Sequence, residues 1–199
     1  MKLYWCAKSR AVRALWMIEE LGVECERVVI DIRDETRLKD PEFAVASPMG
    51  KVPALSDGDV HMAESAAICL YLADRYASGS LAPALDDDDR GRFLYWMLYT
   101  PAVIEPAMSE KFSGAKSNRF SNGWGDFDAM IETFEAGLGS GPWILGERFS
   151  AADVMLGSSA VFLRRFGILP DSAVLGSYAD RCEERPAYRK AESADEDPG

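Results

Sequence analysis

The chain of 199 residues has little of what structural metal sites require, with one histidine and four cysteines. Cys6, Cys25, Cys69 and Cys182 lie far apart and form no CxxC pair. Structural zinc sites need clustered ligands, so we expect no metal site. The chain also has no run of 18 apolar residues, and its opening, MKLYWCAKSR, contains no apolar signal segment. We therefore expect a cytosolic protein with reduced thiols that does not enter membranes.

Positive charge is also scarce: the chain has 22 Lys and Arg residues and 33 Asp and Glu residues, which gives a net charge of −11. This balance argues against nucleic acids and anionic membranes as partners. The excess of acid is uneven: residues 1–78 hold 10 basic against 13 acidic residues, and residues 79–199 hold 12 against 20. An anion-binding site is therefore expected in the N-terminal part.

The first 76 residues alternate short apolar strands with amphipathic helices. A strand, a helix that Ser9 caps, and a second strand predict a βαβ unit, and a hairpin that turns at Asp57-Gly58 and a further helix follow. The predicted ranges are strands at 2–5 and 25–32, helices at 9–22 and 64–76, and a hairpin at 51–62. Parallel strands joined by a crossover, together with a hairpin, predict a small mixed sheet.

The rest of the chain has an all-helical pattern. We expect a first domain over 1–77, a linker over 78–89 that is rich in Gly, Pro and Asp, and a helical domain over 90–199. Pro101 and Pro106 should interrupt the first long helix of that domain, since proline lacks the N–H that an inner turn donates. Ser150 and Asp153 have the spacing of a reciprocal helix cap, which is a structural role.

The stretch GKVPALSDGDVHMAES, residues 50–65, carries the strongest sign of a binding site. Pro53 is predicted inside a strand, where a residue without an N–H marks a sheet edge or a special backbone site such as a cis bond after Val52. Glu64 and Ser65 then open a helix, whose N-terminus favours anions. An edge backbone beside such a helix end is suited to holding a small peptide with a carboxylate.

Five segments occur in a characteristic order: SRAVRALWMIEELGVE, SPMGKVPAL, ESAAICLYLADRY, GERFSAADVMLG and RPAYRKA. In this order they resemble the cytosolic glutathione transferases over nearly the whole chain, with bacterial-type members nearest and the serine site of the theta and delta classes the closest motif. The resemblance implies an α/β thioredoxin-like N-terminal domain, an all-α C-terminal domain and a homodimer.

The resemblance also implies which residues hold glutathione. Val52, before cis-Pro53, would pair its backbone with the cysteinyl part of the peptide. Glu64 and Ser65 would hold the γ-glutamyl end, Ser65 through its hydroxyl and N–H and Glu64 by accepting from the ammonium. Lys51 stands where many members place a polar or basic residue for the glycyl carboxylate.

Three residues near the first helix are candidates for activating the glutathione thiol, whose ordinary pKa near ~8.5 leaves it protonated at neutral pH. Ser9 is favoured, because a hydroxyl at a helix N-terminus stabilises a thiolate, and its S-x-x-x-R spacing to Arg13 resembles the serine site. Cys6 would allow a mixed disulfide, and Tyr4 lies where the tyrosine classes place their phenol. His61 is expected to be a surface strand residue rather than a base.

The function that the resemblance implies is conjugation of the glutathione thiolate to a small apolar electrophile, as in detoxification. Glutathione would be the co-substrate. Three alternatives stay open: thiol–disulfide exchange or peroxide reduction through Cys6, a non-catalytic glutathione-fold binding protein, and isomerisation of a small unsaturated acid as in the zeta class. The last is disfavoured because the chain lacks that class's run of serines and cysteine ahead of the first helix.

Overall fold

The computed structural model describes residues 1–196 and divides into two compact units. One comprises Met1–Ser78 together with the chain from Glu184 onward, and the other is Gly79–Glu183. This division differs from the expected one at its C-terminal end, because the last helix lies with the first unit. No helix within residues 1–196 has the length and apolar character needed to cross a bilayer.

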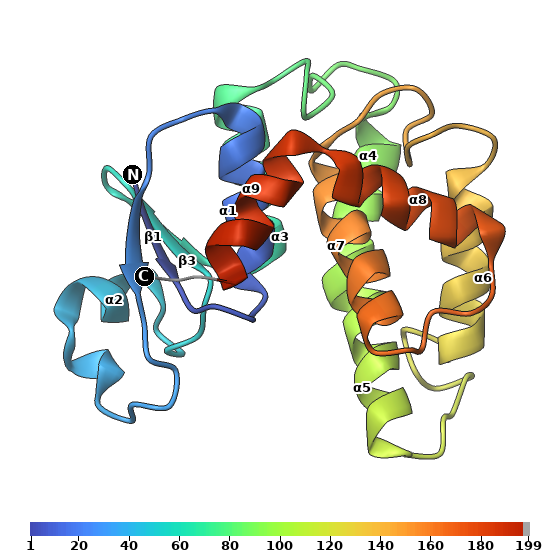
Figure 1. Cartoon of the computed structure of the whole chain (residues 1–199), viewed down its shortest axis with the longest axis horizontal. Coiled ribbons are helices and arrows are strands. Elements are labelled where there is room, and N and C mark those ends of the chain that lie inside the picture. The colour runs from blue at the N-terminus through green and yellow to red at the C-terminus, as the bar shows by residue number, and fades with distance from the viewer. Residues whose placement is uncertain (197–199) are drawn as a thin grey trace. The chain divides into compact units, whose positions relative to one another are not determined.

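The first unit is built on a four-stranded mixed sheet in the order β2-β1-β3-β4. Strand β1 pairs parallel with β2 and antiparallel with β3, and β3 pairs antiparallel with β4. Helices α1 and α3 cover one face and α2 the other (Figure 1). The elements are β1 (Lys2–Trp5), α1 (Ala11–Leu21), β2 (Glu26–Val29), η1 (Arg37–Lys39), α2 (Pro41–Ala46), β3 (Ala54–Asp57), β4 (Val60–Ala63), α3 (Ser65–Tyr76) and α9 (Pro186–Glu196). The predicted thioredoxin-like α/β arrangement is confirmed.

Two details of the hairpin differ from the prediction. Strand β3 begins at Ala54, so Pro53 precedes the strand instead of lying inside it, as its missing N–H favours. The two-residue turn is Gly58-Asp59, one residue later than expected, with Gly58 at φ +60°. Glycine tolerates this left-handed backbone, which explains the shift of the turn.

Helix α9 returns to the first unit and packs against α1. The rings of Trp16 and Tyr188 meet edge to face with centroids 4.9 Å apart. Arg185 donates two hydrogen bonds, of 2.6 and 2.7 Å, to the carboxylate of Glu20. Apolar contact and a bidentate ion pair therefore join the end of the chain to its beginning. The predicted frayed tail is helical as far as Glu196, and its last residues, 197–199, lie outside the described part.

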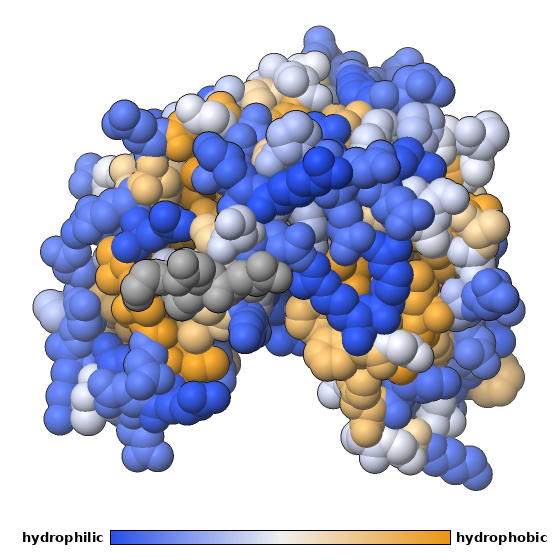
Figure 2. Space-filling model, in the orientation of Figure 1, coloured by the Kyte–Doolittle hydropathy of each residue, from blue (hydrophilic) through white to orange (hydrophobic). Residues whose placement is uncertain are grey.

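The second unit is helical, as predicted. Its elements are α4 (Arg90–Tyr99), the π-helical segment η2 (Thr100–Ile104), α5 (Glu105–Ser113), α6 (Phe127–Leu138), α7 (Ala151–Arg165) and α8 (Ala173–Glu184). The predicted interruption at Pro101 and Pro106 takes the form of η2, where wider turns replace the regular helix. On the surface, charged and polar side chains cover much of the face shown in Figure 2, with apolar patches between them.

Helix α7 is buried along nearly its whole length and forms the centre of this unit. Its start carries the predicted capping box, in which Ser150 N–H donates to Asp153 Oδ2 at 3.0 Å. The carboxylate of Asp153 also accepts from Ile144 N–H at 2.8 Å and from Tyr178 O–H at 3.0 Å. Ser150 and Asp153 therefore have the structural role predicted for them.

Candidate functional site

Strand register brings three distant segments to one end of the sheet. Ala54 pairs with Ala63, so the residue before β3, Pro53, lies beside the residue after β4, Glu64. Ala54 also pairs with Tyr4, so the end of β1 and the loop that follows it reach the same end. The predicted peptide-holding residues and the loop with Cys6 and Ser9 therefore belong to one region of the first unit.

The backbone before Val52 is held by a serine that the sequence analysis did not single out. The Ser47 hydroxyl accepts from Lys51 N–H at 2.8 Å and donates to the Lys51 carbonyl at 2.7 Å. The Val52–Pro53 peptide bond is cis, as predicted. The side chain of Lys51 is exposed, so its charge is accessible to an anion. The segment SPMG contains Ser, Pro and Gly, which favour turns, so a turn in which Ser47 bonds to the backbone was foreseeable from the sequence.

A second contact, from Arg37, holds the loop between α2 and β3. Gly50 has φ +61°, and its carbonyl accepts from Arg37 Nε at 2.9 Å. A Cβ at Gly50 would lie 3.2 Å from both Arg37 Nε and Leu38 Cγ. Only glycine fits this close approach of η1 without displacement, and the loop that presents Lys51 and Val52 depends on it.

Glu64 and Ser65 lie at the start of α3, as predicted. Glu64 has φ +71°, which is uncommon for a residue with a side chain and costs roughly 1–2 kcal/mol. Its carboxylate makes no capping bond to the helix and is exposed. Ser65 is the first helical residue and is buried. The opening N–H groups of α3 and this hydroxyl therefore form a donor set suited to a carboxylate.

Ser9 lies just before α1, one residue earlier than a capping residue would. The helix starts at Ala11, with Arg10 at the capping position, so the predicted position of the cap is wrong by one residue. The Ser9 hydroxyl donates to the Cys6 carbonyl at 2.6 Å and accepts from Ala11 N–H at 3.1 Å. The half-buried thiol of Cys6 donates to the Ala7 carbonyl at 3.5 Å. Both groups therefore occupy one turn at the helix N-terminus.

Tyr4 is directed away from that turn. Its ring is 1% exposed and packs on Phe43 of α2 with centroids 5.5 Å apart. Side chains alternate along a strand, so Tyr4 lies on the α2 face, while Leu3 and Trp5 lie on the face covered by α1 and α3. The structure brings Ser9 and Cys6 together and separates Tyr4 from them.

Helices α1 and α3 are tied together near their starts. Cys69 Sγ donates to the Arg13 carbonyl at 3.7 Å, and Arg13 is itself buried. Burial raises the pKa of the Cys69 thiol to about 12. This cysteine therefore stays protonated and is a packing residue, since the thiolate is the reactive form.

Comparison with known proteins gives the family of this arrangement. The model of the glutathione S-transferase N-terminal domain matches residues 1–74, and that of the C-terminal domain matches residues 105–189. Glutathione S-transferase hmp2 of Hypomyces subiculosus is 31% identical over 180 residues, which span 84% of each chain. The chain belongs to the glutathione S-transferase family. A probable glutathione S-transferase of Oryza sativa, GSTF2, is 30% identical over 197 residues, covering 89% of this chain and 86% of the relative.

Solved structures agree with this family. A sphingomonad glutathione S-transferase complexed with glutathione superposes with a TM-score of 0.81 at 26% identity, covering 98% of this chain and 99% of that one. The bacterial transferase BphK, at 24% identity and a TM-score of 0.83, covers 98% of this chain and all of its own, and shows the fold alone. The predicted fold and enzyme class, a glutathione transferase, are therefore confirmed.

Proposed function

We propose that this glutathione transferase binds glutathione at the end of the sheet where Val52, Glu64 and Ser65 meet, and transfers its thiolate to a small apolar electrophile. The observation that carries the proposal is the convergence of this peptide-holding set with the turn that holds Ser9. Lys51 completes the set by attracting the glycyl carboxylate.

Ser9 is the group that stabilises the thiolate in this proposal. Its hydroxyl needs only to turn from the Cys6 carbonyl to the sulfur, because it already lies at the start of α1. The helix N-terminus adds a favourable field for negative charge. Lowering the thiol pKa by about 2 units requires roughly 2.7 kcal/mol of differential stabilisation, which one such hydrogen bond and a helix end supply together.

The decisive test compares Ser9→Ala with Ser80→Ala, a change at an exposed serine in the other unit. Ser9→Ala should lower kcat by about 10-fold, raise the pKa of bound glutathione by about 1 unit, because the helix N-terminus still acts, and change glutathione affinity little. Ultraviolet absorbance of the thiolate against pH measures the pKa, and calorimetry measures the affinity. An unchanged rate and pKa would remove Ser9 from the mechanism.

Two further variants separate the remaining candidates. Loss of activity in Cys6→Ser, together with a mixed disulfide at Cys6 after incubation with oxidised glutathione, would assign thiol–disulfide chemistry to that cysteine instead. Mass spectrometry detects this adduct directly. If activity were lost only in Tyr4→Phe, thiol activation would be assigned to the phenol. We do not expect this result, because Tyr4 lies on the α2 face, away from Ser9.

The electrophile is proposed to contact exposed aromatic side chains of the helical unit. Phe112 and Phe166 are each about half exposed, and their rings meet edge to face with centroids 5.3 Å apart. Phe162 extends the cluster, 4.9 Å from Phe166. Phe112→Ala should therefore raise KM for an apolar electrophile more than KM for glutathione, since truncation removes apolar contact area.

A homodimer in the cytosol completes the proposal. Tyr95 and Leu98 expose more than half of their surface on α4, and such a patch on one helix suits a contact between copies. Sedimentation equilibrium should give twice the 21.9 kDa chain mass, and Leu98→Glu should shift the protein to monomer. A monomeric profile of the unmodified protein would refute the dimer. The cytosol is also where four free cysteines remain reduced.

A further inference from the structure

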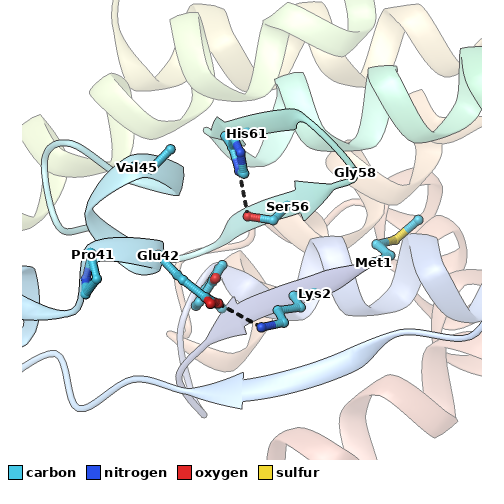
Figure 3. Close-up of a pocket in the computed structure, with 9 residues that line it drawn as sticks. Met1, Lys2, Pro41, Glu42, Val45, Ser56, Gly58 and His61 are labelled. Carbon is cyan, nitrogen blue, oxygen red and sulfur yellow. Dashed lines mark hydrogen bonds and ion pairs between the residues drawn. The ribbon is translucent and has the colours of Figure 1, made fainter.

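A pocket of about 530 Å³ lies on the α2 face of the sheet, toward the hairpin turn. Its lining includes Lys2, Tyr4, Glu42, Val45, Ser56 and His61. Figure 3 shows the Lys2–Glu42 pair on one side and the Ser56–His61 pair on another. None of these residues belongs to the set proposed above to hold glutathione or activate its thiol.

Strand register explains why a pocket forms here. Lys2, Ser56 and His61 lie in one row across three strands, because Lys2 pairs with Ser56 and Ser56 with His61. In the neighbouring row Tyr4 pairs with Ala54, which pairs with Ala63. Two alanines leave room beside the tyrosine ring, and α2, six residues long, covers only part of this face.

The hydroxyl of Tyr4 is a donor without a partner among the described residues, although it is buried. The ring is 1% exposed and is held by its contact with Phe43, so its direction is set by packing. Buried hydroxyl groups in proteins are nearly always hydrogen-bonded. A buried hydroxyl without a partner, on a residue that lines a pocket, therefore points to an acceptor brought by a ligand.

The other polar groups of the pocket favour an anionic head on that ligand. Lys2 Nζ donates to Glu42 Oε2 at 2.7 Å, which uses one of three ammonium donors and pairs the glutamate charge. Ser56 Oγ and His61 Nδ1 are 2.9 Å apart, which leaves the other ring nitrogen for a ligand. The Lys2 ammonium thus keeps two spare donors in the pocket that Tyr4 also lines, and Val45 and Pro41 offer apolar surface there.

We propose that this pocket is a second ligand site, which binds a small monocarboxylate with an apolar body. The carboxylate accepts hydrogen bonds from the Tyr4 hydroxyl and the Lys2 ammonium, and the apolar body lies against Val45 and Pro41. Tyr4 is then a binding residue of this site and has no part in activating the glutathione thiol. The two sites bind their ligands independently, because they share no residue.

The test uses naphthalene-1-carboxylate as the probe and saturating S-hexylglutathione to occupy the proposed glutathione and electrophile sites. Titration calorimetry should show saturable binding that persists with S-hexylglutathione. Tyr4→Phe and Lys2→Met should each weaken it at least about fivefold, the factor expected for one hydrogen bond. Val45→Glu should abolish binding by placing a charged group against the apolar body of the probe. The neutral naphthalene-1-carboxamide should bind more weakly than the acid.

Matched controls are Tyr95→Phe and Lys116→Met, the same changes in the helical unit, which should leave the probe affinity unaltered. Circular dichroism checks that each variant is folded, and Tyr4→Phe removes only a hydroxyl that has no described partner. The proposal is overturned if no saturable binding occurs, if S-hexylglutathione abolishes it, or if Tyr4→Phe and Lys2→Met bind the probe as the unmodified protein does.

Discussion

At the scale of single residues, Asp153 shows how one side chain serves several elements. Its buried carboxylate accepts from Ser150 N–H at the start of α7, from Ile144 N–H in the preceding loop and from Tyr178 of α8. The sequence pattern indicated only the bond to Ser150. The structure adds the other two, so this carboxylate joins two helices and a loop.

Removing that carboxylate should destabilise the fold strongly. Asp153→Ala leaves the Ile144 and Ser150 N–H groups buried without an acceptor, and we expect a loss of about 3–5 kcal/mol in the free energy of unfolding. Urea denaturation followed by tryptophan fluorescence measures the change. Asp128→Ala, at an exposed position in the first turn of α6, is the matched control and should cost less than about 1 kcal/mol. Equal losses in both variants would contradict the role given to Asp153.

The same residue should contribute a pH dependence. Burial raises the pKa of Asp153 from 3.8 to about 6, so between these values the folded protein binds a proton that the unfolded chain releases. The contribution of Asp153 to stability is therefore greatest below about pH 4, falls as the pH rises to about 6 and is constant above that. Asp153→Asn does not titrate. The stability of the unmodified protein relative to this variant should therefore be higher at pH 4 than at pH 7, and a difference independent of pH would contradict the raised pKa.

At the scale of elements, the loop between α2 and β3 decides where Lys51 and Val52 lie. Ser47 clamps Lys51 from one side, and Arg37 holds the Gly50 carbonyl from the other. These contacts join η1, α2 and the start of β3 in a segment that has no ladder hydrogen bonds of its own. The loop is therefore a support for the proposed glutathione site, although none of its braces is proposed to touch the peptide.

Gly50→Ala should disturb this support. Both Gly50 and Gly22 have φ above +60°, but a Cβ at Gly50 meets Arg37 and Leu38 at 3.2 Å, whereas one at Gly22 meets nothing within 4 Å. Gly22→Ala should cost about 1 kcal/mol from backbone conformation alone. Gly50→Ala should cost about 1–2 kcal/mol more and raise KM for glutathione, since the Lys51 backbone moves. Steady-state kinetics and urea denaturation of both variants check this, and equal effects would contradict the steric argument.

At the scale of the whole molecule, the last helix stabilises the first unit. Glu20 of α1 is 8% exposed and accepts two bonds from Arg185, as well as one from Trp16 Nε1 at 2.8 Å. By contrast, the pair between Lys190 and Glu19 has an exposed lysine. The first pair holds Arg185, the residue just before α9, and the second holds Lys190 of α9, both against α1. Their different degrees of burial make them a matched comparison.

Arg185→Met should therefore lower the free energy of unfolding by about 2 kcal/mol, because it leaves a nearly buried carboxylate with one donor in place of three. Lys190→Met should cost less than about 1 kcal/mol, and salt should weaken its effect, as for other exposed pairs. Urea denaturation at low and high salt measures both. If the two variants lose the same stability, burial of the Glu20 pair is not what holds α9 in place.

Much of the architecture was predictable from sequence. Gly22 at the end of α1, the hairpin, the interruption near Pro101 and Pro106 and the capping box at Ser150 each depend on residues close together in the chain. Backbone conformation and helical periodicity are local properties, so they can be recognised from a short segment. The order of five such segments was enough to indicate the glutathione transferase family, which the comparisons confirm.

What the sequence by itself determined was thus the succession of elements, the family and a short set of candidate side chains. Only the tertiary structure decided which candidates meet. Strand register placed Pro53 beside Glu64, alternation along β1 directed Tyr4 to the α2 face away from Ser9, and α9 joined the unit at the other end of the chain. Register, sheet face and helix docking are set by pairing between distant segments, and a local pattern carries no information about that pairing.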